Sequence, residues 1–150
     1  MNRKFARRLL MIIFAAACFL NVASAEECSL LGAAGNWSFS DSGTVIGVGP
    51  RMASGIFTLD ANGKVVNGKA TSSLNGSIAD ETFYGTYSVS QNCRGKLTVK
   101  IFSSGAELFK VTIDLAFDGN MQQVRGIFTS VVEPNGTSLS TVIGIQASKQ

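Results

Sequence analysis

The chain has 150 residues with 45% hydrophobic composition, and it contains thirteen basic, ten acidic and no histidine side chains. The lack of histidine excludes Ser-His and Cys-His catalysis, most zinc sites and haem ligation through imidazole. The basic residues beyond position 8 stand singly from Arg51 to Lys149, so no cationic face for nucleic acid is expected. We therefore expect no catalytic residues, no metal, no cofactor and no nucleic-acid partner.

Residues 1–25 have the three parts of an export signal. Residues 1–8 are basic, residues 9–20 form an unbroken apolar run, and Ala23-Ser24-Ala25 has the small-x-small pattern that signal peptidases cleave. We predict cleavage after Ala25, which leaves residues 26–150 as a single domain. Nine basic and ten acidic residues remain in that segment, so its net charge is −1.

The apolar run is shorter than a bilayer-spanning helix requires, and no later stretch approaches that length, so no transmembrane span is expected in the mature chain. We predict an exported protein, either periplasmic or extracellular. The alternative is a lipid anchor on Cys18, because Ala16-Ala17-Cys18 resembles the end of a lipoprotein signal. Against this alternative, Ala15 stands where such signals usually have leucine.

With Cys18 in the signal, Cys28 and Cys93 remain as an even pair of cysteines. In an oxidising compartment such a pair predicts a disulfide. Closing a loop of this length stabilises a fold by about 4 kcal/mol in the chain-entropy model. Two free thiols are the alternative.

In the segment after the signal, short stretches in which apolar and polar residues alternate are separated by turn signals. All sixteen glycines lie here, many of them in pairs such as Asn62-Gly63 and Asn75-Gly76 that favour tight hairpin turns. The alternation has a period of two, which predicts about eight strands. No segment outside the signal has a helical period. The predicted strands cover 37–40, 53–60, 64–73, 83–90, 96–101, 108–117, 122–132 and 137–147.

Four of these strands contain the element Gly-x-aromatic-hydroxyl, starting at Gly35, Gly55, Gly85 and Gly126. Glycine allows a strand to bend sharply, and the aromatic ring covers the space left by the missing side chain. Hairpin-length connections between successive strands favour a single antiparallel up-and-down barrel, because closure removes exposed strand edges. A two-sheet β-sandwich is the competing fold.

The register of the barrel follows from pairing apolar with apolar positions across the turns at 91–95 and 118–121. We expect four opposed pairs, the last of them an exposed ion pair. The pairs are Tyr87 with Val99, Val89 with Leu97, Val111 with Phe128, and Asp114 with Arg125.

Candidate acid–base groups are limited to carboxylates. Asp80-Glu81 is the one adjacent acidic pair in the domain body, and neighbours on a strand point to opposite faces, so the two do not share a proton. We interpret them as charged turn residues. The turns at Asp60 and Asp118 lack the further carboxylates of a calcium loop and are interpreted as hairpin turns.

Cys28-Ser-Leu30 followed by Gly35-Asn-Trp37 resembles the opening of avidin and lipocalin (calycin) barrels. Because Trp37 is the chain's only tryptophan, this resemblance does not extend to biotin binding. Gly35-Asn-Trp-Ser-Phe39, Gly55-Ile-Phe-Thr-Leu-Asp60, and Gly85-Thr-Tyr-Ser-Val89 running into Cys93-Arg-Gly95 are similar to an uncharacterised family of small exported bacterial β proteins. That family shares a Gly-Thr-Tyr-x-Val…Cys-x-Gly core. The resemblance implies export and a β fold, and it implies no activity.

These observations predict an exported, non-enzymatic barrel that binds a small apolar ligand or a partner protein of the envelope or extracellular space. The expected ligand-binding residues are Trp37, Tyr87, Phe109 and Phe128, with Trp37 closing one end. The first alternative is a barrel filled by its own core. The second is a structural or envelope-associated protein without a small-molecule ligand, and the third is an enzyme using carboxylates or a Ser-Lys pair, which no spacing supports.

Overall fold

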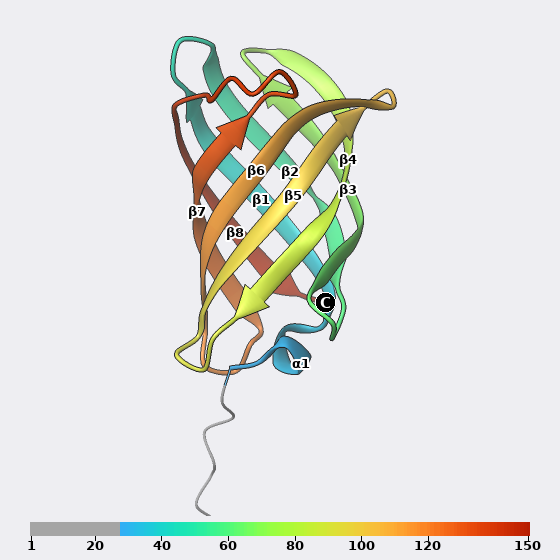
Figure 1. Cartoon of the computed structure of the whole chain (residues 1–150), viewed down its shortest axis with the longest axis vertical. Helices are drawn as coiled ribbons and strands as arrows, with labels where there is room; N and C mark the ends of the chain where they lie inside the picture. The colour runs from blue at the N-terminus through green and yellow to red at the C-terminus, as the bar shows by residue number, and fades with distance from the viewer. Residues whose placement is uncertain (1–27) are drawn as a thin grey trace, which may run out of the picture.

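The computed structural model describes residues 28–150, which form a closed barrel of eight antiparallel strands joined in sequence order (Figure 1). The predicted up-and-down barrel is confirmed, and the β-sandwich alternative is wrong. A short helix, α1 (Leu30–Ala33), precedes the first strand. The strands are β1 (Gly35–Val45), β2 (Gly49–Leu59), β3 (Lys64–Leu74), β4 (Ser77–Val89), β5 (Arg94–Ser103), β6 (Ala106–Phe117), β7 (Gln123–Val132) and β8 (Thr141–Lys149).

The barrel closes where β1 pairs with β8, from Trp37 opposite Lys149 to Val45 opposite Thr141. Alternate residues of every strand point inward, and the apolar ones form one continuous core. The predicted signal peptide, its cleavage after Ala25 and the alternative lipid anchor at Cys18 all lie outside the described residues. Within residues 28–150, no helix is long and apolar enough to cross a membrane.

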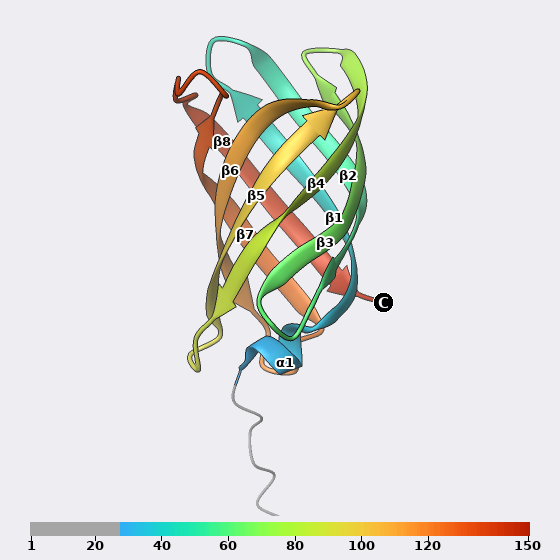
Figure 2. The ribbon, with the colours of Figure 1, turned by 45° about the vertical axis from the view of Figure 1, so that its right-hand side comes forward.

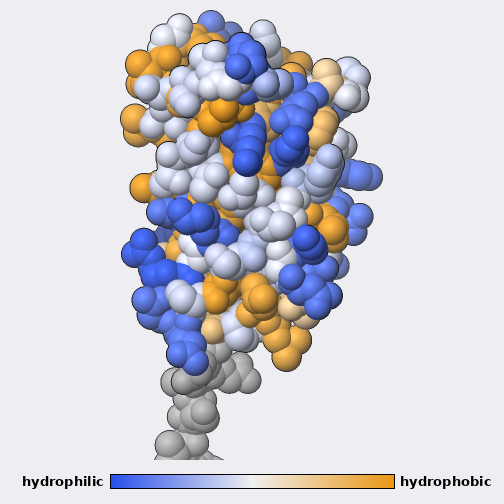
Figure 3. All heavy atoms as spheres, viewed as in Figure 1, coloured by the Kyte–Doolittle hydropathy of each residue, from blue (hydrophilic) through white to orange (hydrophobic). Residues whose placement is uncertain are grey.

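The outer surface mixes polar and apolar side chains. Lys96, Lys100 and Lys110 are exposed on β5 and β6, the strands at the front of Figures 1 and 3. Lys100 forms an ion pair with Glu107, with 2.8 Å between nitrogen and oxygen. The predicted alternation of these two strands therefore places their polar positions toward solvent.

The Gly-x-aromatic element marks positions where neighbouring strands approach closely inside the barrel. A Cβ atom added at Gly85 would overlap the carbonyl oxygen of Thr98 on β5. Tyr87, two residues further along β4, points inward and is 6% exposed. The missing side chain therefore permits this close approach of β4 to β5, and the ring of Tyr87 is the next inward side chain along β4.

The predicted register between β4 and β5 is wrong by two residues. Tyr87 lies opposite Leu97, and Val89 lies opposite Gly95. The turn is centred earlier than predicted, because Cys93 adopts a positive φ of 63° and its N–H donates to the carbonyl of Ser90 at 2.9 Å. A shift of two residues keeps every side chain on the face that the pattern assigned to it.

The predicted register between β6 and β7 is also wrong. The Asp118 carboxylate accepts hydrogen bonds from the N–H groups of Gln122 and Gln123 at 2.8 and 2.9 Å, so the turn extends to Gln122 and β7 begins at Gln123. A bulge between Thr112 and Ile113 adds a further offset. The observed partners are Val111 with Val131, Ile113 with Phe128, Asp114 with Ile127, and Ala116 with Arg125.

Asp114 therefore does not pair with Arg125, although both side chains point outward. Its partner is Lys96 of β5, with 3.1 Å between Nζ and Oδ1. Lys96 lies directly opposite Asp114 in the β5–β6 ladder. The predicted Asp114–Arg125 ion pair is wrong, and Asp114 instead pairs with a lysine on its other neighbouring strand, β5.

We call the end of the barrel that carries α1 the lower end, as it is drawn in Figure 2. The predicted disulfide is confirmed: Cys28 is bonded to Cys93, which ties the segment before β1 to the turn between β4 and β5. Trp37 is fully buried inside the barrel next to α1, and its Nε1 donates to the carbonyl of Ala33 at 2.9 Å. Lys149 also reaches α1, donating to the carbonyl of Gly32 at 2.7 Å. These contacts close the lower end.

Helix α1 was not predicted, because four residues give no detectable helical period. Ser29 caps its N-terminus, because the Ser29 side chain accepts a hydrogen bond from the N–H of Gly32 at 3.0 Å. The Tyr87 hydroxyl lies 3.0 Å from the carbonyl of Leu30 and 2.6 Å from that of Asp60. Burial, reinforced by the charge of Asp60, raises the pKa of Tyr87 to about 12.

Candidate functional site

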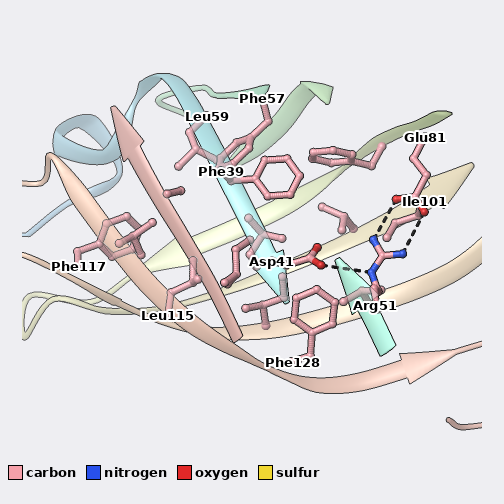
Figure 4. A pocket seen from close by; sticks show the side chains of 18 residues that line it. Phe39, Asp41, Arg51, Phe57, Leu59, Glu81, Ile101, Leu115, Phe117 and Phe128 are labelled. Atoms are coloured by element: carbon pink, nitrogen blue, oxygen red, sulfur yellow. Dashed lines mark hydrogen bonds and ion pairs between the residues drawn. The ribbon is translucent and has the colours of Figure 1, made fainter. Parts of the chain in front are cut away.

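The barrel encloses a cavity of about 50 Å³ near its middle. Figure 4 shows the eighteen side chains that surround it, which come from every strand except β3. Most of the wall is aliphatic or aromatic. Three of the lining residues carry charge, and these are Asp41, Arg51 and Glu81.

A second cavity of about 20 Å³ lies between the first and the upper end of the barrel. Arg51 and Phe128 line both spaces, so the two cavities are neighbours. Leu139, from the connection between β7 and β8, also lines the second cavity, and its N–H donates to the carbonyl of Val131 at 2.8 Å. The connection is thereby held over the upper end.

Arg51 and Glu81 form a bidentate pair inside the barrel. Nη1 and Nη2 of Arg51 donate to Oε1 and Oε2 of Glu81, both at 3.1 Å. Ser72 adds a third hydrogen bond, from its hydroxyl to Oε1 of Glu81 at 2.7 Å. Arg51 is 7% exposed and Glu81 is 4% exposed. This parallel arrangement is the strongest geometry available to a guanidinium and a carboxylate.

Asp41 completes the charged group without an equivalent set of partners. Its Oδ1 lies 3.4 Å from Nε of Arg51, at an angle that makes an ion pair but no hydrogen bond. Neither Oδ1 of Asp41 nor Nε of Arg51 has a hydrogen-bond partner among the described residues. Asp41 is 3% exposed. Figure 4 shows its carboxylate pointing into the cavity toward Arg51.

Two carboxylates share one guanidinium in this group, which we call the interior triad (Asp41, Arg51 and Glu81). Burial raises the pKa of Asp41, and the charge of Glu81 acts in the same direction, while Arg51 and the backbone N–H of Ala53 oppose it. Burial alone would lower the pKa of Arg51, but its hydrogen bonds and charge interactions with Glu81 and Asp41 raise it overall. Arg51 therefore stays charged, whereas ionisation of Asp41 is disfavoured by its burial.

Small inward residues make room for the interior triad. In the β1–β2 ladder Gly43 lies opposite Arg51, and Ala53 lies opposite Asp41. In the β3–β4 ladder Ala70 lies opposite Glu81. Because directly opposed residues share a face of the sheet, each charged side chain lies beside a glycine or an alanine.

The structure places the four predicted ligand-binding residues in two different regions. Phe128 lines both cavities and Phe109 lines the second. Trp37 and Tyr87 point inward but belong to the packed lower end, and neither appears in the wall of either cavity. Trp37 lies at the closed lower end, where it donates to the carbonyl of Ala33. Contact of these four residues with a ligand remains a prediction.

Sequence reasoning missed three aromatic residues and the interior triad. Phe39, Phe57 and Phe83 line the cavity and pack together, with ring centroids 5.7 to 6.2 Å apart. The signal for Asp41 was present in the alternation Trp37, Phe39, Asp41, which continues the inward face by one step. The first predicted strand was ended at Ser40, one residue before it.

The interpretation of Asp80 and Glu81 as turn residues is wrong. Both lie within β4, where Glu81 points inward to Arg51 and Asp80 points outward, accepting a hydrogen bond from the Thr71 hydroxyl at 2.9 Å. The expectation that neighbours on a strand face opposite ways is confirmed. Within residues 28–150 no three His, Cys, Asp or Glu side chains gather in a way that holds a metal ion.

No protein-family model matches the sequence, and neither does any curated protein. Among solved structures, the chain is similar to EF1p2_mFAP2b bound to DFHBI, with a TM-score of 0.57 and 11% sequence identity over 81% of this chain and 97% of that one. A redesigned β-barrel, b11L5F_LGL, matches with a TM-score of 0.49 and 14% identity over 81% of this chain and 95% of that one. The first likeness supports the barrel fold.

Proposed function

We propose that this protein is a non-enzymatic binding barrel that holds a small, largely apolar molecule in its interior. The observation that carries the proposal is the cavity lined by Phe39, Phe57, Phe83 and Phe128, with a buried carboxylate oxygen at Asp41 that accepts no hydrogen bond within the described residues. Binding sites for small molecules combine apolar and aromatic walls with a few polar groups that orient the ligand. A barrel filled only by its own core gives no reason to keep a buried carboxylate oxygen that accepts no hydrogen bond.

The similar barrel of EF1p2_mFAP2b was solved bound to DFHBI, which supports binding of a small molecule within this architecture. The cavity of about 50 Å³ has room for a few water molecules. A larger ligand requires wall side chains to move. Phe39, Phe83 and Phe128 are half-buried rather than fully packed, and we expect their rings to rotate when a ligand enters.

We infer binding rather than catalysis because the polar lining of the cavity offers no nucleophile beside a general base. Its polar lining residues are Asp41, Arg51 and Glu81, two of which are held together in the bidentate pair. We also propose that the protein is exported. The Cys28–Cys93 bond supports this location, since structural disulfides form and persist in oxidising compartments.

The proposal is tested by native mass spectrometry of protein purified from its own host, followed by thermal melts with a panel of small apolar molecules. A retained ligand, or a ligand that raises the melting temperature, is the expected result. If the purified protein carries nothing and no compound raises the melting temperature, interior binding is wrong. A partner protein or a structural role in the envelope then becomes the better explanation.

A further inference from the structure

We propose that the interior site selects a ligand carrying a protonated amine, with an N–H group donating to Asp41 and the apolar body packed against the phenylalanine rings. This inference rests on the proposed function and names its ligand class. It follows from three features of the cavity: an open acceptor, an unbalanced charge and an aromatic wall.

The first feature is the open acceptor at Asp41. Glu81 already receives two hydrogen bonds from Arg51 and one from Ser72. Oδ1 of Asp41 receives no hydrogen bond within the described residues, although Asp41 is only 3% exposed. Nε of Arg51 lies 3.4 Å from this oxygen and forms an ion pair with it. A buried carboxylate oxygen without a donor is costly. A ligand that supplies a donor at this position relieves that cost.

The second feature is the charge of the cavity. Its ionisable lining residues are two carboxylates and one guanidinium, so the fully ionised site has one negative charge in excess. A carboxylate ligand would add a second excess charge in a poorly hydrated space. An alcohol would leave the excess unchanged, whereas a protonated amine would cancel it. The charge balance therefore ranks the amine first and the acid last.

The third feature is the cluster of Phe39, Phe57 and Phe83 in the same wall. Phe39 meets Phe83 edge to face, with an interplanar angle of 85°, and both rings contact Phe57 at a tilt. Such an arrangement presents a ring face beside a ring edge, and ring faces attract cations. These residues and Asp41 line one cavity, so a single small amine reaches both.

The experiment compares benzylamine, benzyl alcohol, benzoate and toluene, four molecules with the same ring and different head groups. Binding is measured by isothermal titration calorimetry and by the melting temperature near neutral pH. We expect benzylamine to bind at least about tenfold more tightly than benzyl alcohol or toluene, and benzoate to bind most weakly. If toluene or benzyl alcohol matches benzylamine, interior binding stands and the amine inference is wrong. If none of the four binds, the amine inference is wrong, and interior binding is then decided by the retained-ligand and panel measurements described above.

Asp41→Asn provides the residue-level test, with Asp80→Asn as the matched control on the outer face. Asp41→Asn should remove the preference for benzylamine over benzyl alcohol, while Asp80→Asn should retain it. An unchanged preference in Asp41→Asn overturns the assignment of Asp41. Should Asp41→Asn fail to fold, the carboxyl ¹³C shift of Asp41 is followed in the wild-type protein instead. Benzylamine should then lower the pKa of that carboxyl, and no change would contradict the inference.

Discussion

Arg51 of β2 and Glu81 of β4 meet across the barrel interior through two parallel hydrogen bonds of 3.1 Å. The two strands do not pair with each other, since β3 lies between them. The third strand participates through Ser72, which donates to Glu81 at 2.7 Å. Three strands are thus joined by side chains in addition to the backbone ladder, at the level where the cavity lies.

Removing Arg51 should destabilise the protein severely. Arg51→Met leaves Glu81 and Asp41 buried without a cation, and breaking a buried ion pair on one side costs about 3–5 kcal/mol. The free energy of unfolding is measured by urea denaturation, with exposed Arg94→Met as the control. The double variant Arg51→Met/Glu81→Leu should recover part of the loss. If Arg51→Met alone unfolds like the wild type, the pair does not stabilise the fold.

Asp41→Asn should change how stability depends on pH. The pKa of Asp41 is raised from 3.8, chiefly by burial, so its ionisation opposes folding. The stability associated with the protonated carboxyl is present in full below the unfolded-state pKa and is lost as pH rises through the folded-state pKa. The unfolding free energy of Asp41→Asn relative to wild type should therefore increase as pH rises from 3.8 through the raised pKa of the folded state. Urea denaturation at several pH values measures this difference, and a constant difference would contradict the raised pKa.

Phe128→Ala should enlarge the interior, because Phe128 lines both cavities. The expected cost is about 3–5 kcal/mol of unfolding free energy. If the barrel binds apolar ligands, the variant should also alter the rise in melting temperature caused by benzylamine or toluene. Phe102→Ala is the control, because this ring stacks on exposed Tyr84 at 5.3 Å on the outer face. A loss of stability with identical ligand response would indicate a core position only.

Replacing both bonded cysteines, as Cys28→Ser/Cys93→Ser, should lower the unfolding free energy by up to about 4 kcal/mol. The bond joins residues 65 positions apart and fixes the segment that leads into α1. Adding a thiol reductant to the wild-type protein should reproduce the effect and leave the double variant unchanged. Equal stability of the oxidised, reduced and substituted proteins would show that Trp37 and Lys149 hold the lower end without the disulfide.

The period-two alternation and the glycine-containing turn signals were sufficient to predict the eight-stranded barrel. Whether a strand residue points inward or outward depends only on whether its position along the strand is odd or even. The same reasoning placed Phe128 inside and Asp80 and Glu81 on opposite faces. The cysteine pairing was also predictable, since Cys28 and Cys93 are the two cysteines beyond the predicted signal. These conclusions depend on local pattern and on counting, and neither requires knowledge of which strands are neighbours.

Register and the interior triad were decided by the tertiary structure. The hydrogen bonds of Asp118 and the bulge at Thr112 shift the β6–β7 pairing, and a pattern of period two contains no information about such offsets. Arg51 and Glu81 stand thirty residues apart in sequence, and they meet because closure turns β2 and β4 toward one interior. Arg51 thus finds its partner on a strand that β2 does not pair with, and the pattern along one strand does not reveal such a partner.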